Sequence, residues 1–479
     1  MATRRYINQG IALVFTVLLR SASGTSCGTT TAKLQGILDA TAAAGGGWAQ
    51  FPCGFHTTEA LTLPSGVKLG SWHCATKALT LGACEPGSKQ QHIISVGNGT
   101  GHMISGIRFD HTNLTDPSTR TSCAVAGGSG ATNFVLESSH FLNINTTSHG
   151  FSAIQMAGCE GCVVRGNVVP KSGGDALNFN SGTYIITDNL VENVGDGCIA
   201  MNNNAFGLIS NNVLRSCNLG VGAGPSGSSA SAASSTPFVI SGNQIEDCDY
   251  GILLGWFGYA GRVGPIGSVV SNNVILRPRS CGIQYNGGPG AHDGSWIVQG
   301  NQIMHSGFPA TPPPHTDPSE VGPGRGIYAA SLSNVHIIGN AVTNGRGDAI
   351  TAMGLHFIIS GNILQGPPPS GNTTTTAACG ITVPDSVDVT IVDNNCRGFG
   401  TAIAVADKDR LVVRGNSIDV SHSSAALGVV VEATAARVVV SDNTVSGSVM
   451  DAITQKEQQC FTMAGAASST RVSRNNLCW

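Results

Sequence analysis

The chain has 479 residues, of which 64 are glycine, and charged residues make up only 11% of it. So little charge excludes a disordered chain, a coiled coil and a nucleic-acid-binding protein. Glycine together with Ser, Thr, Asn and β-branched residues instead predicts short strands joined by tight turns.

The N-terminal segment has the pattern of a secretory signal peptide. Two arginines precede the apolar run 11–19, and the small residues Ser21 and Ser23 follow it at cleavage spacing. The run is too short to span a bilayer, so we expect cleavage after Ser23; an uncleaved N-terminal anchor is the alternative. Loss of residues 1–23 removes three arginines and no acid, which changes the net charge from −3 to −6. We therefore expect a secreted or cell-surface protein without a membrane span and without a nucleic-acid partner.

The segment 24–47 is predicted to cap the fold at its N-terminal end. Residues 29–44 are expected to form a helix with one of its first three residues, all threonine, as the N-cap. Leu34, Ile37 and Leu38 share one face of this helix, and three consecutive glycines end it.

A repeated motif along most of the chain predicts the fold. It consists of a β-branched residue, two further residues and an asparagine, and its base period is 22 to 23 residues. Stacked repeats of this length bury a common core that no single repeat could form. We therefore expect one all-β domain over residues 24–479, a right-handed parallel β-helix of about thirteen or fourteen coils. The motif asparagines are Asn167, Asn189, Asn212, Asn243, Asn273, Asn301, Asn340, Asn362, Asn394, Asn416, Asn443 and Asn475.

These asparagines are predicted to be structural. An Asn at a tight turn tolerates the left-handed conformation, and its amide can hydrogen-bond to the Asn of the next coil, as in other stacked amide ladders. A second motif, a Gly or Asp that begins a short apolar strand, recurs between the asparagines. The segment 455–479 is expected to cap the C-terminal end.

Fifteen cysteines fit an oxidising compartment. One CxxC pair, Cys159 and Cys162, stands alone, so we expect no zinc site. We expect no cofactor; calcium is the open alternative, since Asn and Asp oxygens are plentiful but no acidic cluster marks a site. The candidate glycosylation sites are Asn98, Asn113, Asn145 and Asn372.

The beginning of the domain resembles that of the pectin-lyase-like β-helix superfamily. The glycine-rich turn 45–47 leads into the sequence Phe51-Pro52-Cys53-Gly54, and the segment 61–67 reads Leu-Thr-Leu-Pro-Ser-Gly-Val. Superfamily members often start with a helix followed by these two segments. The resemblance implies the fold, and it leaves the reaction open because one fold hosts many activities.

A second resemblance is to the catalytic motifs of polygalacturonases. Asp175 and Asp196, 21 residues apart, stand in Gly-Asp segments that resemble two motifs of that family. The resemblance implies that Asp196 is the general acid and that Asp175 helps to activate water. The chain departs from the family at Gly197, where the family has a second Asp, and at Leu219, where it has a His. An Arg-x-Lys pair that the family carries is also missing.

A structural interpretation of the carboxylates stands beside this one. Asp348 and Asp451 begin strands in the same Asp-Ala setting as Asp175, so an Asp at this position could simply bind turn amides. The same resemblance implies a disulfide between Cys198 and Cys217, with Cys248 as a competing partner for Cys217.

Insertions after and before the Gly-led strand predict two loop walls with a groove between them. A groove on a flat sheet suits an extended polysaccharide or glycan. The side chains expected to contact it are Trp256, Arg262, Tyr285, His292 and Arg325, since aromatic rings pack on sugars and Arg pairs with carboxylates.

We therefore expect an enzyme that acts on an extended polysaccharide: a glycosidase, a uronate lyase or an epimerase. In a lyase or epimerase, His292 or Tyr285 would be the base, and Arg262 or Arg325 would neutralise the carboxylate. The alternative is a non-catalytic solenoid that binds glycans or builds a surface or fibre. The sequence indicates no oligomeric state.

Overall fold

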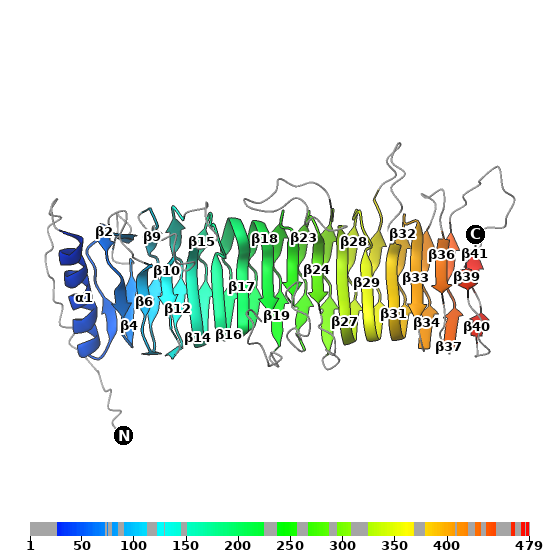
Figure 1. Ribbon diagram of the computed structural model, residues 1–479, viewed down its shortest axis with the longest axis horizontal. Helices are drawn as coiled ribbons and strands as arrows, with labels where there is room; N and C mark the ends of the chain where they lie inside the picture. The colour runs from blue at the N-terminus through cyan, green and yellow to red at the C-terminus, as the bar shows by residue number, and fades with distance from the viewer. Residues whose placement is uncertain are drawn as a thin grey trace, which may run out of the picture.

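A rod of stacked parallel strands makes up the computed structural model (Figure 1). It describes residues 26–71, 74, 79–84, 91–112, 122–128, 130–144, 151–224, 237–255, 267–286, 295–307, 324–367, 379–407, 410–419, 427–432, 437–446, 461–464, 471–474 and 476–478. The helix α1 (Cys27–Ala43) lies across the N-terminal end of the rod (Figure 1). No helix among these residues is long and apolar enough to cross a membrane.

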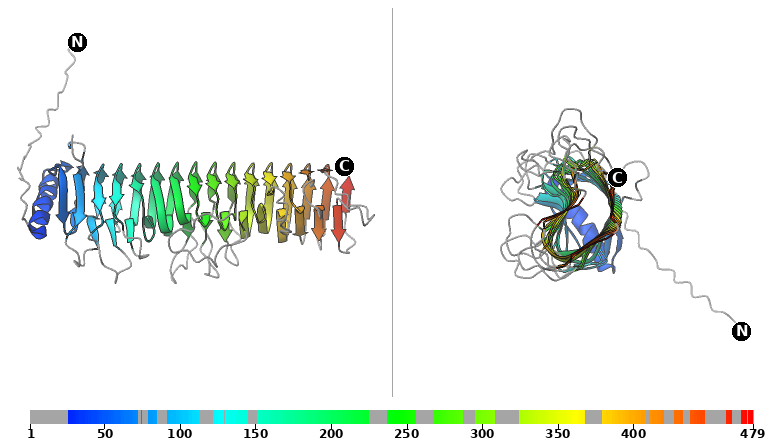
Figure 2. Two further views of the ribbon diagram at one scale, coloured as in Figure 1. Left: turned by 90° about the horizontal axis from the view of Figure 1, so that it is seen from above. Right: turned by 90° about the vertical axis from the view of Figure 1, so that its right-hand side faces the viewer.

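Each coil contributes strands to three faces, seen end-on in Figure 2. Seven strands run on from one face to another: β14 (Phe151–Arg165), β16 (Leu177–Thr187), β17 (Leu190–Ser210), β18 (Val213–Gly224), β27 (Arg325–Ile338), β29 (Ile350–Ser360) and β31 (Cys379–Val392). Two short pieces, β7 (Gly99–Thr100) and β11 (Ala131–Thr132), pair outside the three faces.

Face 1 precedes the motif asparagines. Besides parts of β14, β16, β17, β27, β29 and β31, it contains β1 (Gly47–Ala49), β4 (Val67–Gly70), β8 (Met103–Ser105), β12 (Val135–Glu137), β19 (Phe238–Ser241), β22 (Val269–Ser271), β25 (Trp296–Gln299), β34 (Arg410–Arg414), β37 (Arg437–Ser441) and β40 (Arg471–Arg474).

Face 2 follows the asparagines. Besides parts of β17 and β18, it contains β2 (Gly54–Thr58), β5 (Leu79–Ala83), β9 (Arg108–Asp110), β13 (His140–Leu142), β15 (Val168–Val169), β20 (Gln244–Glu246), β23 (Val274–Leu276), β26 (Gln302–Met304), β28 (Ala341–Thr343), β30 (Ile363–Gln365), β32 (Asn395–Arg397), β35 (Ser417–Asp419), β38 (Thr444–Ser446) and β41 (Leu477–Cys478).

Face 3 carries the Gly- or Asp-led strands. Besides parts of β14, β16, β17, β18, β27, β29 and β31, it contains β3 (Leu61–Leu63), β6 (His92–Val96), β10 (Ser122–Gly127), β21 (Tyr250–Leu254), β24 (Cys281–Asn286), β33 (Thr401–Asp407), β36 (Leu427–Glu432) and β39 (Phe461–Ala464).

The predicted parallel β-helix is confirmed, and the register gives its length. On face 1 the described strands β1, β4, β8, β12, β14, β16, β17, β19, β22, β25, β27, β29, β31, β34, β37 and β40 pair in sequence. We call each level of the stack a rung; these sixteen rungs span about 70 Å at about 4.8 Å per step. The stack exceeds the expected thirteen or fourteen coils because its first rungs precede Asn167 and lack the motif.

The asparagine ladder lies in the interior between faces 1 and 2. Asn189 Oδ1 accepts hydrogen bonds from the backbone N–H and from Nδ2 of Asn167, both at 3.0 Å. Asn189 Nδ2 donates in turn to Asn212 Oδ1 at 2.9 Å and to the Val164 carbonyl at 3.0 Å. The same pattern continues to Asn443, and the ladder side chains are almost fully buried. Every polar atom of these amides is therefore satisfied within the coil stack.

From Asn167 to Asn443, the left-handed turn residue is the one before each ladder asparagine, and not the asparagine itself as expected. Asp188 has φ 58° and Asn211 has φ 56°. Along the ladder this position holds only Gly, Asn or Asp, which are the residues that tolerate the conformation best. The ladder asparagines thereby keep extended backbone and a buried amide.

The last rung of the ladder is Asn476, not the predicted Asn475. Asn443 donates from its backbone N–H and from Nδ2 to Asn476 Oδ1, both at 3.1 Å. Register explains the difference, since Val440 pairs with Ser473 and Asn476 thus stacks on Asn443. Asn475 itself lies outside the described residues.

The N-terminal cap differs from the prediction only at its start. Ser26 is the N-cap, because its hydroxyl accepts the Thr29 N–H. Leu34 and Leu38 are buried against the first rung. Gln35 then pairs with the free edge of β3, accepting the Thr62 N–H at 2.9 Å and donating to its carbonyl at 3.0 Å. The helix therefore covers the core and satisfies a strand edge.

The segment 455–479 does not form a separate cap where it is described. Its strands β39, β40 and β41 pair with β36, β37 and β38 and so form a further coil. The remaining parts of that segment lie outside the described residues.

Four disulfides join described residues. Cys27 bonds to Cys84 and Cys53 to Cys74, which fastens the N-terminal rungs together. Cys159 and Cys162, the isolated CxxC pair, bond to each other within β14, so these thiols are not available to a metal.

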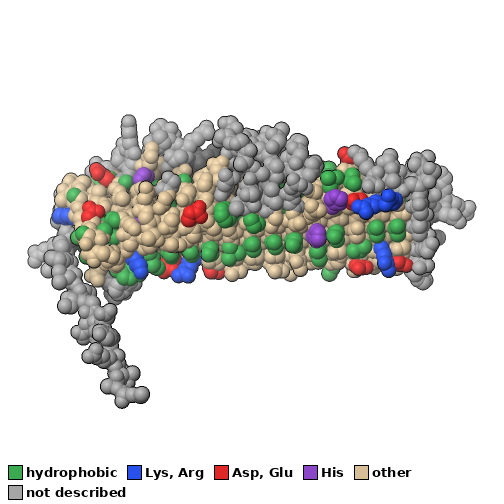
Figure 3. All heavy atoms as spheres, turned by 90° about the horizontal axis from the view of Figure 1, so that it is seen from below, with side chains coloured by type: hydrophobic (Ala, Val, Ile, Leu, Met, Phe, Trp, Pro, Cys, Tyr) green, Lys and Arg blue, Asp and Glu red, His purple; other side chains and the backbone are tan. Residues whose placement is uncertain are grey.

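A row of aliphatic side chains follows the outer surface of face 1, and Figure 3 shows a line of hydrophobic side chains along the rod. The register stacks Val163, Ile185, Leu208 and Val239 in this row. Ile185 and Val239 are 40% and 39% exposed. Contact between successive members adds dispersion energy outside the core.

Candidate functional site

The two candidate catalytic acids lie in adjacent coils on face 3. Leu177 pairs with Ile199, which places Asp175 opposite Gly197 and Asp196 one residue earlier on β17. Both side chains are half-buried. We call Asp175 and Asp196 the acid pair.

Asp175 is held by two donors. Its Oδ1 accepts the Gly197 N–H at 2.9 Å, and its Oδ2 accepts Asn178 Nδ2 at 2.8 Å. Burial and then the negative charge of Asp196 raise the pKa of Asp175 to about 8, against the two hydrogen bonds, which lower it. Burial and the neighbouring charge therefore favour the protonated form of the Asp175 carboxyl group.

The Asp348 carboxylate makes the same kinds of contact. Its Oδ1 accepts the Cys379 N–H at 2.9 Å, and its Oδ2 accepts the Thr351 hydroxyl at 3.2 Å. These contacts match those expected for an Asp that binds turn amides. Asp175 differs from Asp348 in having a second acid next to it. Asp196 precedes Gly197, whose N–H binds Asp175, whereas the residue before Cys379, whose N–H binds Asp348, is Ala378.

The pH dependence of stability should separate Asp175 from Asp348. Because the pKa of Asp175 rises from 3.8 to about 8 on folding, the native state keeps a proton that the unfolded chain has lost. Stability then falls as the pH rises through this window. The Asp175→Asn variant has no such proton, so its Tm should rise relative to wild type between pH 4 and pH 8. Thermal melts across this range test it; the same trend in Asp348→Asn would contradict an effect of the acid pair.

The two departures from the polygalacturonase motif have structural counterparts. A Cβ at Gly197 would stand 2.8 Å from Asp175 Oδ1, so the carboxylate occupies the space that a side chain there would need. Leu219 is 4% exposed and lies over Gly222. Its aliphatic side chain provides no proton donor beside the acid pair.

A group of bonded side-chain amides extends from Asp175 along face 3, and the sequence analysis missed it. Asn178 Oδ1 accepts Nδ2 of Asn180 at 3.0 Å and Nδ2 of Asn202 at 3.4 Å. Asn203 Nδ2 donates to Asn180 Oδ1 at 3.2 Å. We call these four asparagines the amide cluster. Its signal in the sequence is the alternation Asn178-Phe179-Asn180, which puts Phe179 inside and both amides outside.

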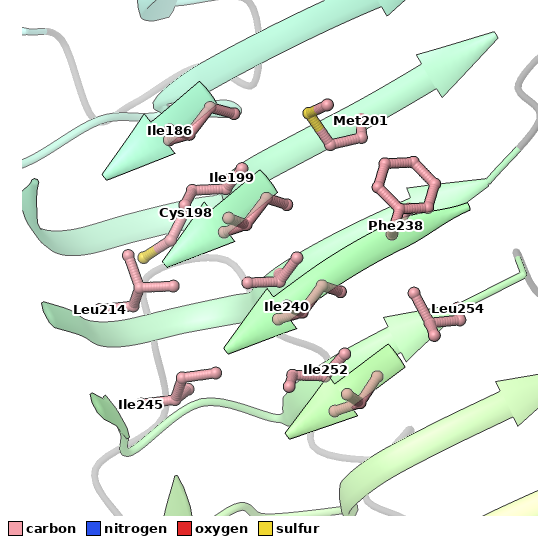
Figure 4. Close-up of a cluster of buried hydrophobic side chains, with 14 of the residues drawn as sticks. Ile186, Cys198, Ile199, Met201, Leu214, Phe238, Ile240, Ile245, Ile252 and Leu254 are labelled. Carbon is pink, nitrogen blue, oxygen red and sulfur yellow. The ribbon is translucent and has the colours of Figure 1, made fainter. Parts of the chain in front are cut away.

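The predicted disulfide between Cys198 and Cys217 is confirmed, with 5.8 Å between the Cα atoms. It joins β17 to β18 beneath the acid pair, and both cysteines are fully buried. Figure 4 shows Cys198 among the interior side chains next to Ile199 and Leu214. Cys248, the competing partner, is a buried free thiol whose pKa burial raises to about 12.

The predicted substrate contacts are only partly placed. Trp256, Arg262 and His292, like the loop walls, lie outside the described residues. Arg325 lies on face 3 with its guanidinium carbon 4.5 Å from the ring centre of Tyr328. It is five rungs from Asp175, about 24 Å away at about 4.8 Å per rung, and so does not contact the acid pair.

Tyr285 does not lie on the outer surface as expected. It is 5% exposed and packs on Trp296 with 4.1 Å between ring centres. Burial raises the pKa of its hydroxyl well above the usual range. The side chain points into the core because Leu254 and Ala329, its partners in register, do so as well, which removes it from substrate contact and from the role of a base.

The remaining predicted sites are described in part. Asn98 is exposed between β6 and β7, whereas Asn113, Asn145 and Asn372 lie outside the described residues. Within the described part of the chain, no group of three or more His, Cys, Asp or Glu side chains is placed to hold a metal ion.

A family model described as the right-handed beta helix region matches residues 152–354 and 291–477, which together cover more than half of the chain. No curated protein matches the chain in a sequence comparison.

Three solved structures illustrate the similarity of fold. The DFA-IIIase of Arthrobacter chlorophenolicus A6, in complex with GF2, is 12% identical over 79% of this chain and 93% of its own, with a TM-score of 0.42. The exopolygalacturonase of Thermotoga maritima is 10% identical over 90% and 85%, with a TM-score of 0.33. The tailspike protein of E. coli bacteriophage HK620, in complex with a pentasaccharide, is 12% identical over 90% and 74%, with a TM-score of 0.46. At these identities the likeness concerns the fold alone.

Proposed function

The chain belongs to the right-handed β-helix family, and we propose that it is a secreted carbohydrate-active enzyme that hydrolyses glycosidic bonds with Asp175 and Asp196. The observation that carries the proposal is the acid pair itself. Two half-buried carboxylates from adjacent coils interact closely enough for the charge on Asp196 to raise the pKa of Asp175. One protonated and one ionised carboxyl group is the arrangement that glycoside hydrolysis uses.

The proposed roles reverse those implied by the family resemblance. Asp175, whose pKa is raised, donates its proton to the glycosidic oxygen as the carbon–oxygen bond breaks. Asp196, ionised, takes a proton from the water that attacks the sugar carbon. The Gly197 N–H and the Asn178 amide hold the Asp175 carboxyl group in position throughout.

The buried disulfide beneath the acid pair supports this assignment. It fixes β17 to β18 and thereby limits movement of the strand that carries Asp196. The disulfides also support a secreted or cell-surface location, since such bonds persist in oxidising compartments.

The second candidate is a non-catalytic glycan-binding or structural solenoid. The observation in its favour is that Asp348 repeats both contacts of Asp175 without a paired acid. The loss of the family's His at Leu219 points the same way.

An assay on a panel of polysaccharides distinguishes these functions. Hydrolysis should release reducing ends without forming an unsaturated sugar. Unsaturated products would indicate a lyase instead, and a changed ratio of epimers without new ends would indicate an epimerase. Binding without any product would favour the non-catalytic solenoid.

A further inference from the structure

The aliphatic row on the outer surface of face 1 continues over eleven rungs, from β14 to β37. Nine of its eleven members are aliphatic, and Ile185 and Val239 are the most exposed of them. In register order the row consists of Val163, Ile185, Leu208, Val239, Val269, Ile297, His336, Ile358, Thr390, Val412 and Val439.

A second row runs beside the aliphatic row, two residues further along the same strands. Six of its members carry hydroxyl groups, and we call it the hydroxyl row. It consists of Arg165, Thr187, Ser210, Ser241, Ser271, Gln299, Ile338, Ser360, Val392, Arg414 and Ser441. The two arginines lie near its ends and bind Glu137 and Asp442. We call the two rows together the face 1 strip.

The face 1 strip differs in charge from the neighbouring face. Along face 2, Arg215 binds Glu192 and Glu246, and Arg277 binds Glu246 and Asp247. The described residues of the strip include no Lys, Arg, Asp or Glu between its two arginines. Charged residues are depleted in the centre of protein interfaces, so the strip has the composition of an interface.

The strip also has the shape and size of an interface. Figure 2 shows the successive coils nearly superimposed when the rod is viewed end-on, and Figure 3 shows the line of hydrophobic side chains on the surface. Rungs about 4.8 Å apart and residues about 3.3 Å apart make the strip about 53 Å long and about 13 Å wide, or about 700 Å². Two strips in contact would bury about 1,400 Å², within the range of about 1,200–2,000 Å² for specific interfaces.

We infer that the face 1 strip is the interface of an antiparallel homodimer. A two-fold axis that runs along the strands, between the two copies, reverses the direction of the rod and keeps each row opposite itself. Aliphatic side chains then pack on aliphatic side chains, and hydroxyl groups meet hydroxyl groups. Each copy therefore supplies the surface that the other one fits, and the contact closes as a dimer.

The register fixes which residues meet in this dimer. Ile297 lies in the sixth of the eleven rungs, so it faces its own equivalent in the second copy. Val239 lies two rungs before Ile297 and Ile358 two rungs after it. Val239 of one copy therefore faces Ile358 of the other.

Sedimentation equilibrium on the full-length protein tests the dimer. Wild type should be dimeric at micromolar concentrations, the weak end of the affinities that interfaces of this size reach. Val239→Lys places an unpaired charge in the interface and should raise the dissociation constant at least about 100-fold. A wild-type protein that stays monomeric, or that forms trimers or filaments, would overturn the inference.

The matched control is Ile363→Lys. Ile363 is 58% exposed and lies on face 2, outside the strip, so this variant adds the same charge to a more exposed aliphatic position. Its dissociation constant should stay within about twofold of wild type. Thermal melts should show both variants folded, and an equal loss of dimer in the two would contradict an interface on face 1.

Cysteine cross-linking tests the antiparallel arrangement. Ile297→Cys should form an interchain disulfide under mild oxidation. The two Val239 positions of the dimer are four rungs apart, about 19 Å at about 4.8 Å per rung. Val239→Cys should therefore not cross-link to itself but should cross-link to Ile358→Cys. Wild type, whose described free thiols lie outside the strip, sets the background. Cross-linking of Val239→Cys to itself and not to Ile358→Cys would mean parallel rods and would overturn the inference.

Discussion

The Asp196→Asn variant should fold normally and lose roughly 10²–10⁴-fold in turnover, the size expected for removal of a general acid or base. Asn cannot take the proton of the attacking water, although it keeps the shape of the side chain. The variant also lacks the charge that raises the pKa of Asp175. Its residual activity should therefore decline at a lower pH than that of wild type, so a pH–rate profile of both proteins checks the pairing as well as the rate.

Asp348→Asn is the control for this variant. Asp348 shares with Asp175 a bond from a backbone N–H of the next coil and a bond from the side chain three residues on. Asp348→Asn should therefore disturb the turn contacts that Asp348 and Asp175 have in common without lowering turnover. Equal losses of turnover in Asp196→Asn and Asp348→Asn would indicate that the acid pair only stabilises the turns and takes no part in catalysis.

The fold was predictable because its main determinant is local and repeated. The ladder asparagines recur at coil spacing, and from Asn167 to Asn443 a Gly, Asn or Asp in the left-handed conformation precedes each of them. The predicted number of coils was too low because the first rungs contain no ladder asparagine. Their interior is filled instead by residues such as Phe109 and Phe141, which stack with 5.1 Å between ring centres.

The candidate site was predictable in its acids and in the disulfide beneath them. Spacing places Asp175 and Asp196 in adjacent coils, since 21 residues is close to one period. Whether a side chain points into the core or outward depends on the register of its strand. Insertions of variable length between the repeats prevent this register from being worked out from the sequence. Tyr285 shows the consequence: it follows a Gly-led strand into the core, although its position next to a loop suggested the surface.

The largest effect on stability is expected from the asparagine ladder. Asn212→Leu should destabilise the protein by roughly 2–6 kcal/mol, because at least two buried groups lose their partners at about 1–3 kcal/mol each. One is the Asn189 N–H, which donates to Asn212 Oδ1 at 3.0 Å. The other is the Ile186 carbonyl, which accepts Asn212 Nδ2 at 3.0 Å. Denaturant unfolding followed by circular dichroism measures this loss.

The preceding residue supplies the control for that measurement. Asn211 has φ 56° and an exposed side chain, and Gly adopts this conformation without strain, so Asn211→Gly should change stability by less than about 1 kcal/mol. Two adjacent asparagines would then differ severalfold, because one supplies a backbone conformation and the other completes a buried chain of amides. Similar unfolding midpoints for both variants would show that the coils are held by core packing, with Ile186, Ile209 and Ile240 compensating for the broken ladder.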